Sequence, residues 1–206
     1  MDRLLEHLPE LAVALALAWG SGVRVYAVLF ALGLAGSLDW IALPAHLTVL
    51  EHPLVLAASG LMTCVEFFAD KLPWLDTLWD AVHSFIRVPA GAALAAAVFE
   101  DSGAAVALAA AILGGTVAAG AHFTKAGARA AVNFSPEPFS NWALSLSEDL
   151  AVPFALWLAF AKPLLLVGVV VAFFIATALG ARWLWRVARR RSPQTNGFSR
   201  SPPAGP

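Results

Sequence analysis

Apolar segments of about twenty residues recur along this chain, and that is the length a helix needs to cross a lipid bilayer. Of the 206 residues, 60% are hydrophobic and 13% are charged, whereas soluble proteins have about 45–50% and about 25%. A soluble fold of this size could not hide so much apolar surface, so lipid must cover much of it. The sequence therefore predicts an all-α fold, a polytopic membrane helical bundle, and not an enzyme of the soluble kind.

Six segments are candidates for membrane helices, and the third is short enough to be a continuation of the segment before it. They cover residues 8–34, 53–70, 87–99, 103–122, 142–160 and 163–185. We expect one transmembrane helical domain over residues 1–191. Residues 192–206, rich in Pro, Ser and Gly, are expected to form a disordered cytoplasmic tail.

The distribution of positive charge predicts how these helices are oriented. With six crossings and both termini in the cytoplasm, eleven of the thirteen Lys and Arg residues fall in cytoplasmic segments. The outer loops then hold Lys162 alone, and Arg24 lies inside the first helix. This bias follows the positive-inside rule. We therefore expect cytoplasmic N- and C-termini.

Residues 74–87 have the periodicity of an amphipathic helix. Large apolar side chains fall on one face, and Asp76, Asp80, His83 and Arg87 fall on the other. The pattern predicts an interfacial amphipathic helix on the cytoplasmic surface. Asp76, Asp80 and His83 could also form a metal-binding face, and a solvated polar face accounts for them equally well.

Several ionisable residues lie inside the apolar segments, where each costs several kcal/mol and usually faces a partner, water or a substrate. Under the predicted topology most of them fall in the cytoplasmic half of the bundle. We therefore expect one polar cluster there, able to bind a substrate, an ion or a proton. Its candidate residues are Arg24, Glu66, Asp70, His122, Lys125, Glu148 and Asp149.

Arg24 follows Gly20-Ser21-Gly22, a sequence that can interrupt a helix where the freed backbone lines a cavity. An arginine at such a break could bind an anion or pair with a carboxylate. Glu66 and Asp70 are four residues apart and share one helix face. Two carboxylates so close can bind a cation or share a proton. The alternative is that all of these charges are structural ion pairs.

The later segments contribute charges of both signs. His122, Lys125 and Arg129 form a stripe at helical spacing. The histidine has the titration range of a proton relay, and the two cations could pair with carboxylates or reach toward water. Glu148 and Asp149 lie within the fifth segment and point about 100° apart on a helix, so one of them faces the core.

The chain also divides into two halves of three segments. Each half opens with a glycine-containing helix, at Gly20-Ser21-Gly22 and at Gly114-Gly115, and continues to a helix with paired carboxylates. Inverted repeats with interrupted helices are typical of secondary transporters. The pattern therefore predicts a 3+3 inverted repeat.

Four stretches resemble a known family: EFFADKLPWLDTLWDAVHSFIRVPAGA, GSGVRVY, HFTKAGARAAVNFSPEPFSN and SLSED. The resemblance is to a bacterial membrane family catalogued as domain of unknown function 4126, and it covers most of residues 10–175. It implies a polytopic protein of the bacterial inner membrane and implies no activity. EFFADK is also similar to the E-x-G-D-K motif of cation/proton exchangers, but Glu66 and Asp70 are four residues apart instead of three.

These features predict an ion-coupled secondary transporter or permease without cofactors. The alternative is a membrane scaffold or subunit whose buried charges are structural. A third hypothesis, an intramembrane enzyme, would use His122, Lys125 and Arg129 to clamp a lipid phosphate, but no nucleophile with a base at suitable spacing accompanies them. The expected partners are the lipid bilayer and a small ion or proton, and Gly- and Ala-rich helices permit a homo-oligomer. The net charge of −1 lacks the basic excess of nucleic-acid-binding proteins.

Overall fold

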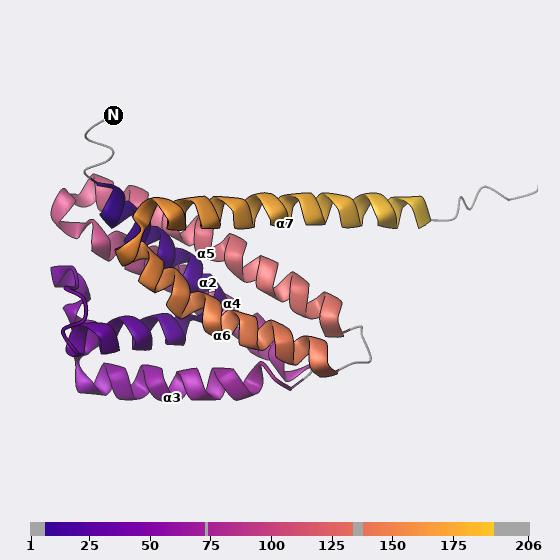
Figure 1. The fold of residues 1–206 in the computed structure, drawn as a ribbon, viewed down its shortest axis with the longest axis horizontal. Coiled ribbons are helices and arrows are strands. Elements are labelled where there is room, and N and C mark those ends of the chain that lie inside the picture. Colours follow the sequence, from indigo (N-terminus) through magenta and orange to yellow (C-terminus); the bar gives the residue numbers. More distant parts are fainter. Residues whose placement is uncertain (1–6, 73, 134–137, 192–206) are drawn as a thin grey trace, which may run out of the picture. The chain divides into compact units, whose positions relative to one another are not determined.

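The computed structural model describes residues 7–72, 74–133 and 138–191, and all regular structure in these ranges is helical (Figure 1). The all-α prediction is therefore confirmed, while the predicted tail over residues 192–206 lies outside the described residues. In chain order the elements are α2 (Leu8–Ser37), η1 (Ala45–Glu51), α3 (Pro53–Ala69), α4 (Leu75–Val98), η2 (Glu100–Ser102), α5 (Ala104–Asn133), α6 (Pro138–Ala161) and α7 (Pro163–Arg191).

The apolar helices indicate a multi-pass membrane protein. Five described helices are long and apolar enough to cross a bilayer, and η1 with α3, bent by 69°, makes a sixth. This agrees with the expectation of about six spans. Large hydrophobic side chains such as Phe85, Leu113 and Leu164 are more than 60% exposed. Exposed apolar side chains on this scale are what a lipid environment requires.

The chain forms two compact units, residues 1–171 and 172–206. The second unit contains α7 from residue 172 onward. Its described residues are mostly exposed and end in an arginine-rich segment. The first unit contains every other helix, and its two ends can be named by their loops. The loop-100 end is where α4 passes into α5 through residues 99–103, and the loop-70 end is where α3 passes into α4 through residues 70–74.

Helix α2 is broken at Arg24, whose φ of −149° and ψ of 81° are not helical. The first arm, residues 8–23, begins at the loop-100 end, where Leu8 and Leu11 lie beside Phe99. It runs toward the loop-70 end. The carbonyl of Val23, its last residue, accepts a hydrogen bond from Lys125, which also donates to Asp70 of loop 70–74.

The second arm, residues 25–37, runs back to the end where α2 started. Near the break, the Tyr26 hydroxyl lies 3.2 Å from Nε2 of His83. Farther along, Gly33 packs against the backbone of Leu50, and η1 is joined to the loop-100 end through His46, 3.1 Å from Asp101. At about 1.5 Å per residue the arms are about 24 and about 20 Å long, short of the roughly 30 Å hydrocarbon core. Helix α2 is thus a hairpin that enters and leaves at one end.

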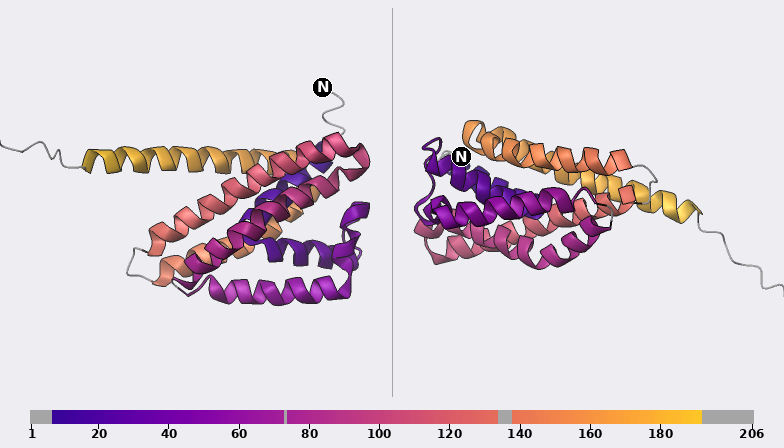
Figure 2. Two further views of the ribbon diagram at one scale, coloured as in Figure 1. Left: turned by 180° about the vertical axis from the view of Figure 1, so that it is seen from behind. Right: turned by 90° about the horizontal axis from the view of Figure 1, so that it is seen from below.

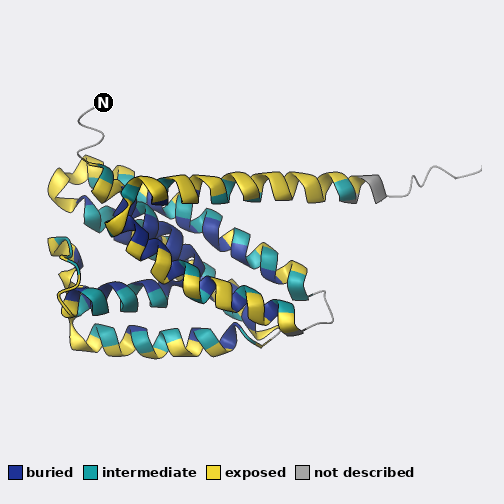
Figure 3. Ribbon diagram, viewed as in Figure 1, coloured by how far each residue is buried: buried dark blue, intermediate teal, exposed yellow. Residues whose placement is uncertain are grey.

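The hairpin is the centre of the first unit. It packs against η1, α3, α4, α5 and α6, and most residues of its first arm are buried (Figure 3). Close approach to α5 depends on Gly22, since a Cβ there would collide with the carbonyl oxygen of Ala118. Helices α4 and α5, which make the most extensive helix pair, lie side by side in the views of Figures 1 and 2.

The prediction of a surface helix over residues 74–87 is wrong. Residues 75–87 belong to the continuous helix α4, and its polar face, with Asp76, Asp80, His83 and Arg87, is buried. The apolar face is the exposed one, with Phe85 at 85%. The polar side chains turn inward because charged partners on neighbouring helices face them there.

The predicted inverted repeat is also not supported by the helix breaks. Helix α5 continues without interruption through Gly114 and Gly115, whereas α2 reverses direction. In α2 the glycines themselves are helical, and the break falls two residues later, at Arg24. The first helix of each half therefore has a different architecture.

A buried charge network at the tip of the α2 hairpin

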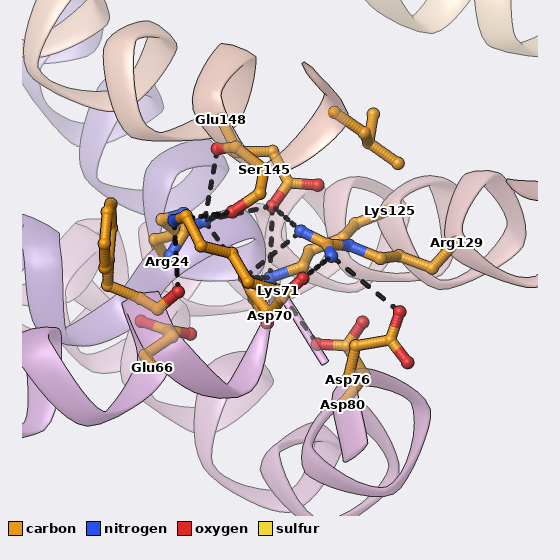
Figure 4. Close-up of polar contacts among 12 residues, drawn as sticks. Arg24, Glu66, Asp70, Lys71, Asp76, Asp80, Lys125, Arg129, Ser145 and Glu148 are labelled. Carbon is orange, nitrogen blue, oxygen red and sulfur yellow. Dashed lines mark hydrogen bonds and ion pairs between the residues drawn. The ribbon is translucent and has the colours of Figure 1, made fainter. Parts of the chain in front are cut away.

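Eleven charged side chains from α2 to α6 and the loop-70 end meet around the tip of the hairpin, and we call this set the charge network. Figure 4 labels all of them except Arg87 and Asp149. It contains every charged residue of the predicted cluster, so the expectation that these groups lie together agrees with the geometry. Its members are Arg24, Glu66, Asp70, Lys71, Asp76, Asp80, Arg87, Lys125, Arg129, Glu148 and Asp149.

Arg24 joins α2 to the loop-70 end and to α6. Its Nη2 lies 3.1 Å from Asp70 and 3.1 Å from Asp149, and it donates to the hydroxyl and the carbonyl of Ser145 at 3.0 and 3.2 Å. The arginine is 1% exposed. A cation buried this deeply is stable only with charged partners. The break in α2 places the guanidinium between two carboxylates.

One carboxylate oxygen of Asp70 forms ion pairs with three cationic side chains. Its Oδ2 lies 2.9 Å from Lys125, 3.1 Å from Arg24 and 3.3 Å from Arg129. Burial disfavours the charged carboxylate, but these three cations together hold the pKa of Asp70, just beyond the end of α3, below its ordinary value. Asp70 is therefore ionised in the folded protein at neutral pH.

Arg129 and Lys125 extend the network to α6. Nη2 of Arg129 lies 2.8 Å from Glu148, and its Nη1 donates to the side-chain oxygen of Asn141 at 2.9 Å and also to the carbonyl of Asp70. Lys125 lies 3.4 Å from the same Glu148 oxygen. Each of these cations therefore faces more than one carboxylate.

Arg87 forms a second centre in the network. It donates to Glu66 at 2.5 Å and to Asp80 at 2.6 Å, and all three side chains are at most 3% exposed. Lys125, 3.5 Å from Asp80, connects this centre to the Asp70 oxygen.

His122 lies at the edge of the Arg87 centre. Its Nε2 is 2.6 Å from the hydroxyl of Ser84, and its Nδ1 is 3.3 Å from Arg87. A pocket of about 180 Å³ between α4 and α5 is lined by Asp80, Ser84, His122 and Arg129, among others. The histidine is thus positioned between this pocket and the buried ion pairs, where a proton could be passed.

The network contains five cations and six carboxylates, so its formal charges are nearly balanced. Some polar atoms nevertheless remain unpaired. Among the described residues, Oε2 of Glu66, Oδ1 of Asp70 and Oδ2 of Asp80 have no hydrogen-bond partner, and neither do Nε and Nη1 of Arg24. Buried polar atoms without partners are costly, and they leave capacity for a ligand or proton.

The candidate metal face on α4 does not form one site. Asp76 accepts hydrogen bonds from Asn133, Asp80 pairs with Arg87, and His83 contacts Tyr26 and the carbonyl of Trp79. Within residues 7–72, 74–133 and 138–191, no three His, Cys, Asp or Glu side chains are grouped so as to hold a metal ion.

Sequence reasoning missed Arg87, which it placed in a cytoplasmic segment, and the amide of Asn141. The helical spacing of Arg87 with Asp80 was visible in the sequence. Nothing in that spacing indicated whether the polar face looks toward water or into a bundle. Asn141 carries no comparable signal.

Comparison with known proteins gives one family and no individual relative. No curated protein and no solved structure matches this chain. The family described as "Domain of unknown function (DUF4126)" matches residues 11–184, a range that includes the hairpin from residue 11 onward and the whole charge network. The chain belongs to this DUF4126 family.

Proposed function

We propose that this protein is an ion-coupled secondary transporter or permease in which the charge network binds a proton or a small cation. The proposal assigns no enzymatic activity. The observation that carries it is the buried arginine at the tip of a broken helix, within 3.1 Å of carboxylates from two other parts of the chain. Broken helices with ionisable groups at mid-depth are the usual construction of ion sites in transporters.

The contacts within the network allow its ion pairs to exchange partners. Lys125 faces three carboxylates at 2.9, 3.4 and 3.5 Å, so small movements can exchange its partners. An isolated pair fixed for stability needs only one partner. Groups with several nearly equivalent partners suit a site that changes its occupancy during a transport cycle.

The near balance of five cations and six carboxylates favours a second candidate, a non-transporting scaffold or subunit held together by structural ion pairs. In that case neutralising one carboxylate would leave a buried cation unpaired and unfold the bundle. Stability and ion movement therefore discriminate between the two functions.

The test reconstitutes the purified protein in liposomes containing a trapped pH indicator and imposes sodium or potassium gradients. We expect proton movement above that of empty liposomes in the wild type, and its loss in Glu66→Gln and Glu148→Gln. Thermal unfolding in detergent is measured for each variant in parallel. Proton movement that is unaltered in both variants contradicts the site assignment. The scaffold is favoured if the wild type moves no protons and the two variants unfold.

We also propose a topology that differs from the predicted one at its first step. Because the α2 hairpin returns to the loop-100 end, α2 does not cross, and the start of α2 shares a side with loop 38–44 and loop 99–103. Five crossings follow, formed by η1 with α3 and by α4, α5, α6 and α7. Within residues 1–171, Lys71, Arg87, Lys125 and Arg129 then lie on the loop-70 side, against Arg3 and Lys162 on the other. The positive-inside rule makes the loop-70 side cytoplasmic and the start of α2 external.

Cysteine labelling tests this topology. Cys64 is the single native cysteine, so Cys64→Ser provides a background for His7→Cys, Asp39→Cys and Leu72→Cys. A membrane-impermeant maleimide should label the first two in intact cells, and Leu72→Cys only after permeabilisation. Labelling of positions 7 and 39 from opposite sides would restore a crossing α2 with a cytoplasmic start.

A further inference from the structure

The ammonium group of Lys125 lies in a cage of oxygen atoms from four different elements. Its Nζ is 2.9 Å from Oδ2 of Asp70, 3.1 Å from the carbonyl oxygen of Val23, 3.4 Å from Glu148 and 3.5 Å from Asp80. The side chain is 4% exposed. Lys125 reaches this position from α5, while the oxygens come from α2, α4, α6 and the end of α3.

The backbone oxygen in the cage exists because α2 is broken. In a continuous helix the carbonyl of residue 23 would accept a hydrogen bond from the amide of residue 27. The non-helical conformation of Arg24 ends the first arm at this point, and the carbonyl faces Lys125 instead. Carbonyls at the C-terminal end of a broken helix carry partial negative charge and coordinate cations in transporters.

Without Lys125, the six carboxylates of the charge network face four cations, so the surroundings of the cage favour a positive charge at this point. Asp70, Asp80 and Glu148 contribute three negative charges, and Arg24 and Arg129, which contact two of these carboxylates, contribute two positive ones. Arg87 is shared between Asp80 and the further carboxylate Glu66, so that pair adds no net charge. Lys125 supplies the positive charge inside the cage, and the network as a whole then has one more carboxylate than cations.

The cage also has unused acceptors. Oδ1 of Asp70 and Oδ2 of Asp80 have no hydrogen-bond partner among the described residues, although these side chains are 0% and 3% exposed. A cation bound by both oxygens of a carboxylate would satisfy such atoms. This capacity lies in two of the three carboxylates that already surround the ammonium.

We propose that the Lys125 cage is the cation site of this protein and that it takes a monovalent cation of about the size of ammonium, for which the Lys125 ammonium is a tethered substitute. This inference rests on the proposed transport function and names its substrate class. The present oxygen distances of 2.9–3.5 Å exceed the roughly 2.3–2.6 Å of calcium and the roughly 2.0–2.1 Å of magnesium coordination. A cation enters when the flexible lysine withdraws, and the charge of the cage is conserved.

Chemical rescue of a lysine-free cage tests the proposal. Purified Lys125→Ala is heated in detergent with ammonium chloride, and with choline chloride or magnesium chloride at the same ionic strength. Ammonium should raise the melting temperature of Lys125→Ala by about 5 °C or more at saturation, and choline and magnesium should not. The wild type should respond less, because its own ammonium occupies the cage.

Two control variants make the result specific. Lys125→Ala/Asp70→Asn removes one negative charge from the emptied cage and should lose the response to ammonium. Lys162→Ala removes an exposed lysine and should behave like the wild type. Equal melting temperatures of Lys125→Ala in ammonium and choline overturn the proposal, and so does an undiminished response in the double variant.

If Lys125→Ala does not fold in choline, it is expressed and purified with ammonium throughout, and recovery of a monodisperse protein is the expected result. Failure to fold in both salts overturns the proposal. The outcome is separable from that of the transport assay. If ammonium rescues Lys125→Ala but the wild type moves no ions, the cation cage is supported and the transport function is contradicted. If the wild type moves ions but ammonium gives no rescue, only the cage is contradicted.

Discussion

The two ends of the first unit are built from the same helices with opposite chemistry. Toward the loop-100 end, the first arm of α2 packs on α4 and α5 through small and apolar side chains, including Ala14, Ala18 and Ala95. Toward the loop-70 end, the same three helices meet charged residues of α3, α6 and the loop-70 end in the charge network. The hairpin tip at Arg24 lies at the charged end, and both open ends of the hairpin lie at the apolar end.

This difference indicates that the two ends of each helix have different roles. Small residues allow the arms to pack closely without any charged group, as Gly22 does against Ala118. Buried ion pairs are weak sources of stability, and the apolar end shows that these helices can associate without them. The proposed ion binding gives these charges a role that apolar packing cannot supply.

Of the substitutions considered, Arg24→Met should lower the free energy of unfolding most. It leaves Asp70 and Asp149 without one of their cations in a buried setting, and such losses cost about 3–5 kcal/mol. Chemical unfolding in detergent measures the free energy of unfolding. Arg182→Met, at an exposed position of α7, serves as the control and should change it by less than about 0.5 kcal/mol. Equal stabilities of the two variants would contradict a buried, paired Arg24.

Gly22→Ala probes the packing of the hairpin and should have a smaller effect. The added Cβ would meet the carbonyl oxygen of Ala118 and lie 2.8 Å from the Cβ of Ala121, and overpacking of this kind costs about 1–3 kcal/mol. Gly127→Ala is the matched control on α5, because nothing lies within 4 Å of its Cβ. It should stabilise the helix by about 0.5–1 kcal/mol. A tolerated Gly22→Ala would show that the first arm is not held against α5.

Much of the charged end could be predicted from the sequence, because ionisable residues in apolar segments have few alternatives to burial with partners. That argument identified Arg24, Glu66 and Glu148. The direction of α2 could not be predicted, because glycine shows where a helix can break and not where its second arm goes. The polar face of α4 was misplaced for a related reason, since the same periodicity suits a helix on a membrane surface and a helix facing a charged interior.

Acid should weaken the charged end before the apolar end, and this is the smallest effect expected near neutral pH. The pKa of Asp70 is lowered in the folded state by its three cations. Its contribution to stability is therefore complete above the pKa of the unfolded chain and is lost as pH falls through the lower, folded value. Unfolding measured as a function of pH should depend on acid less steeply in Asp70→Asn than in the wild type. Identical pH profiles would show that Asp70 is not ionised in the network.

Ion flux is measured for two variants, each with one carboxylate neutralised at one end of the first unit. Glu148→Gln removes a buried charge of the network, and Glu100→Gln removes an exposed charge near the loop-100 end. In liposomes with a trapped pH indicator, Glu148→Gln should lose most of the wild-type proton movement, and Glu100→Gln should retain it. Equal flux in the two variants, with both proteins folded, would contradict the claim that the charge network moves ions.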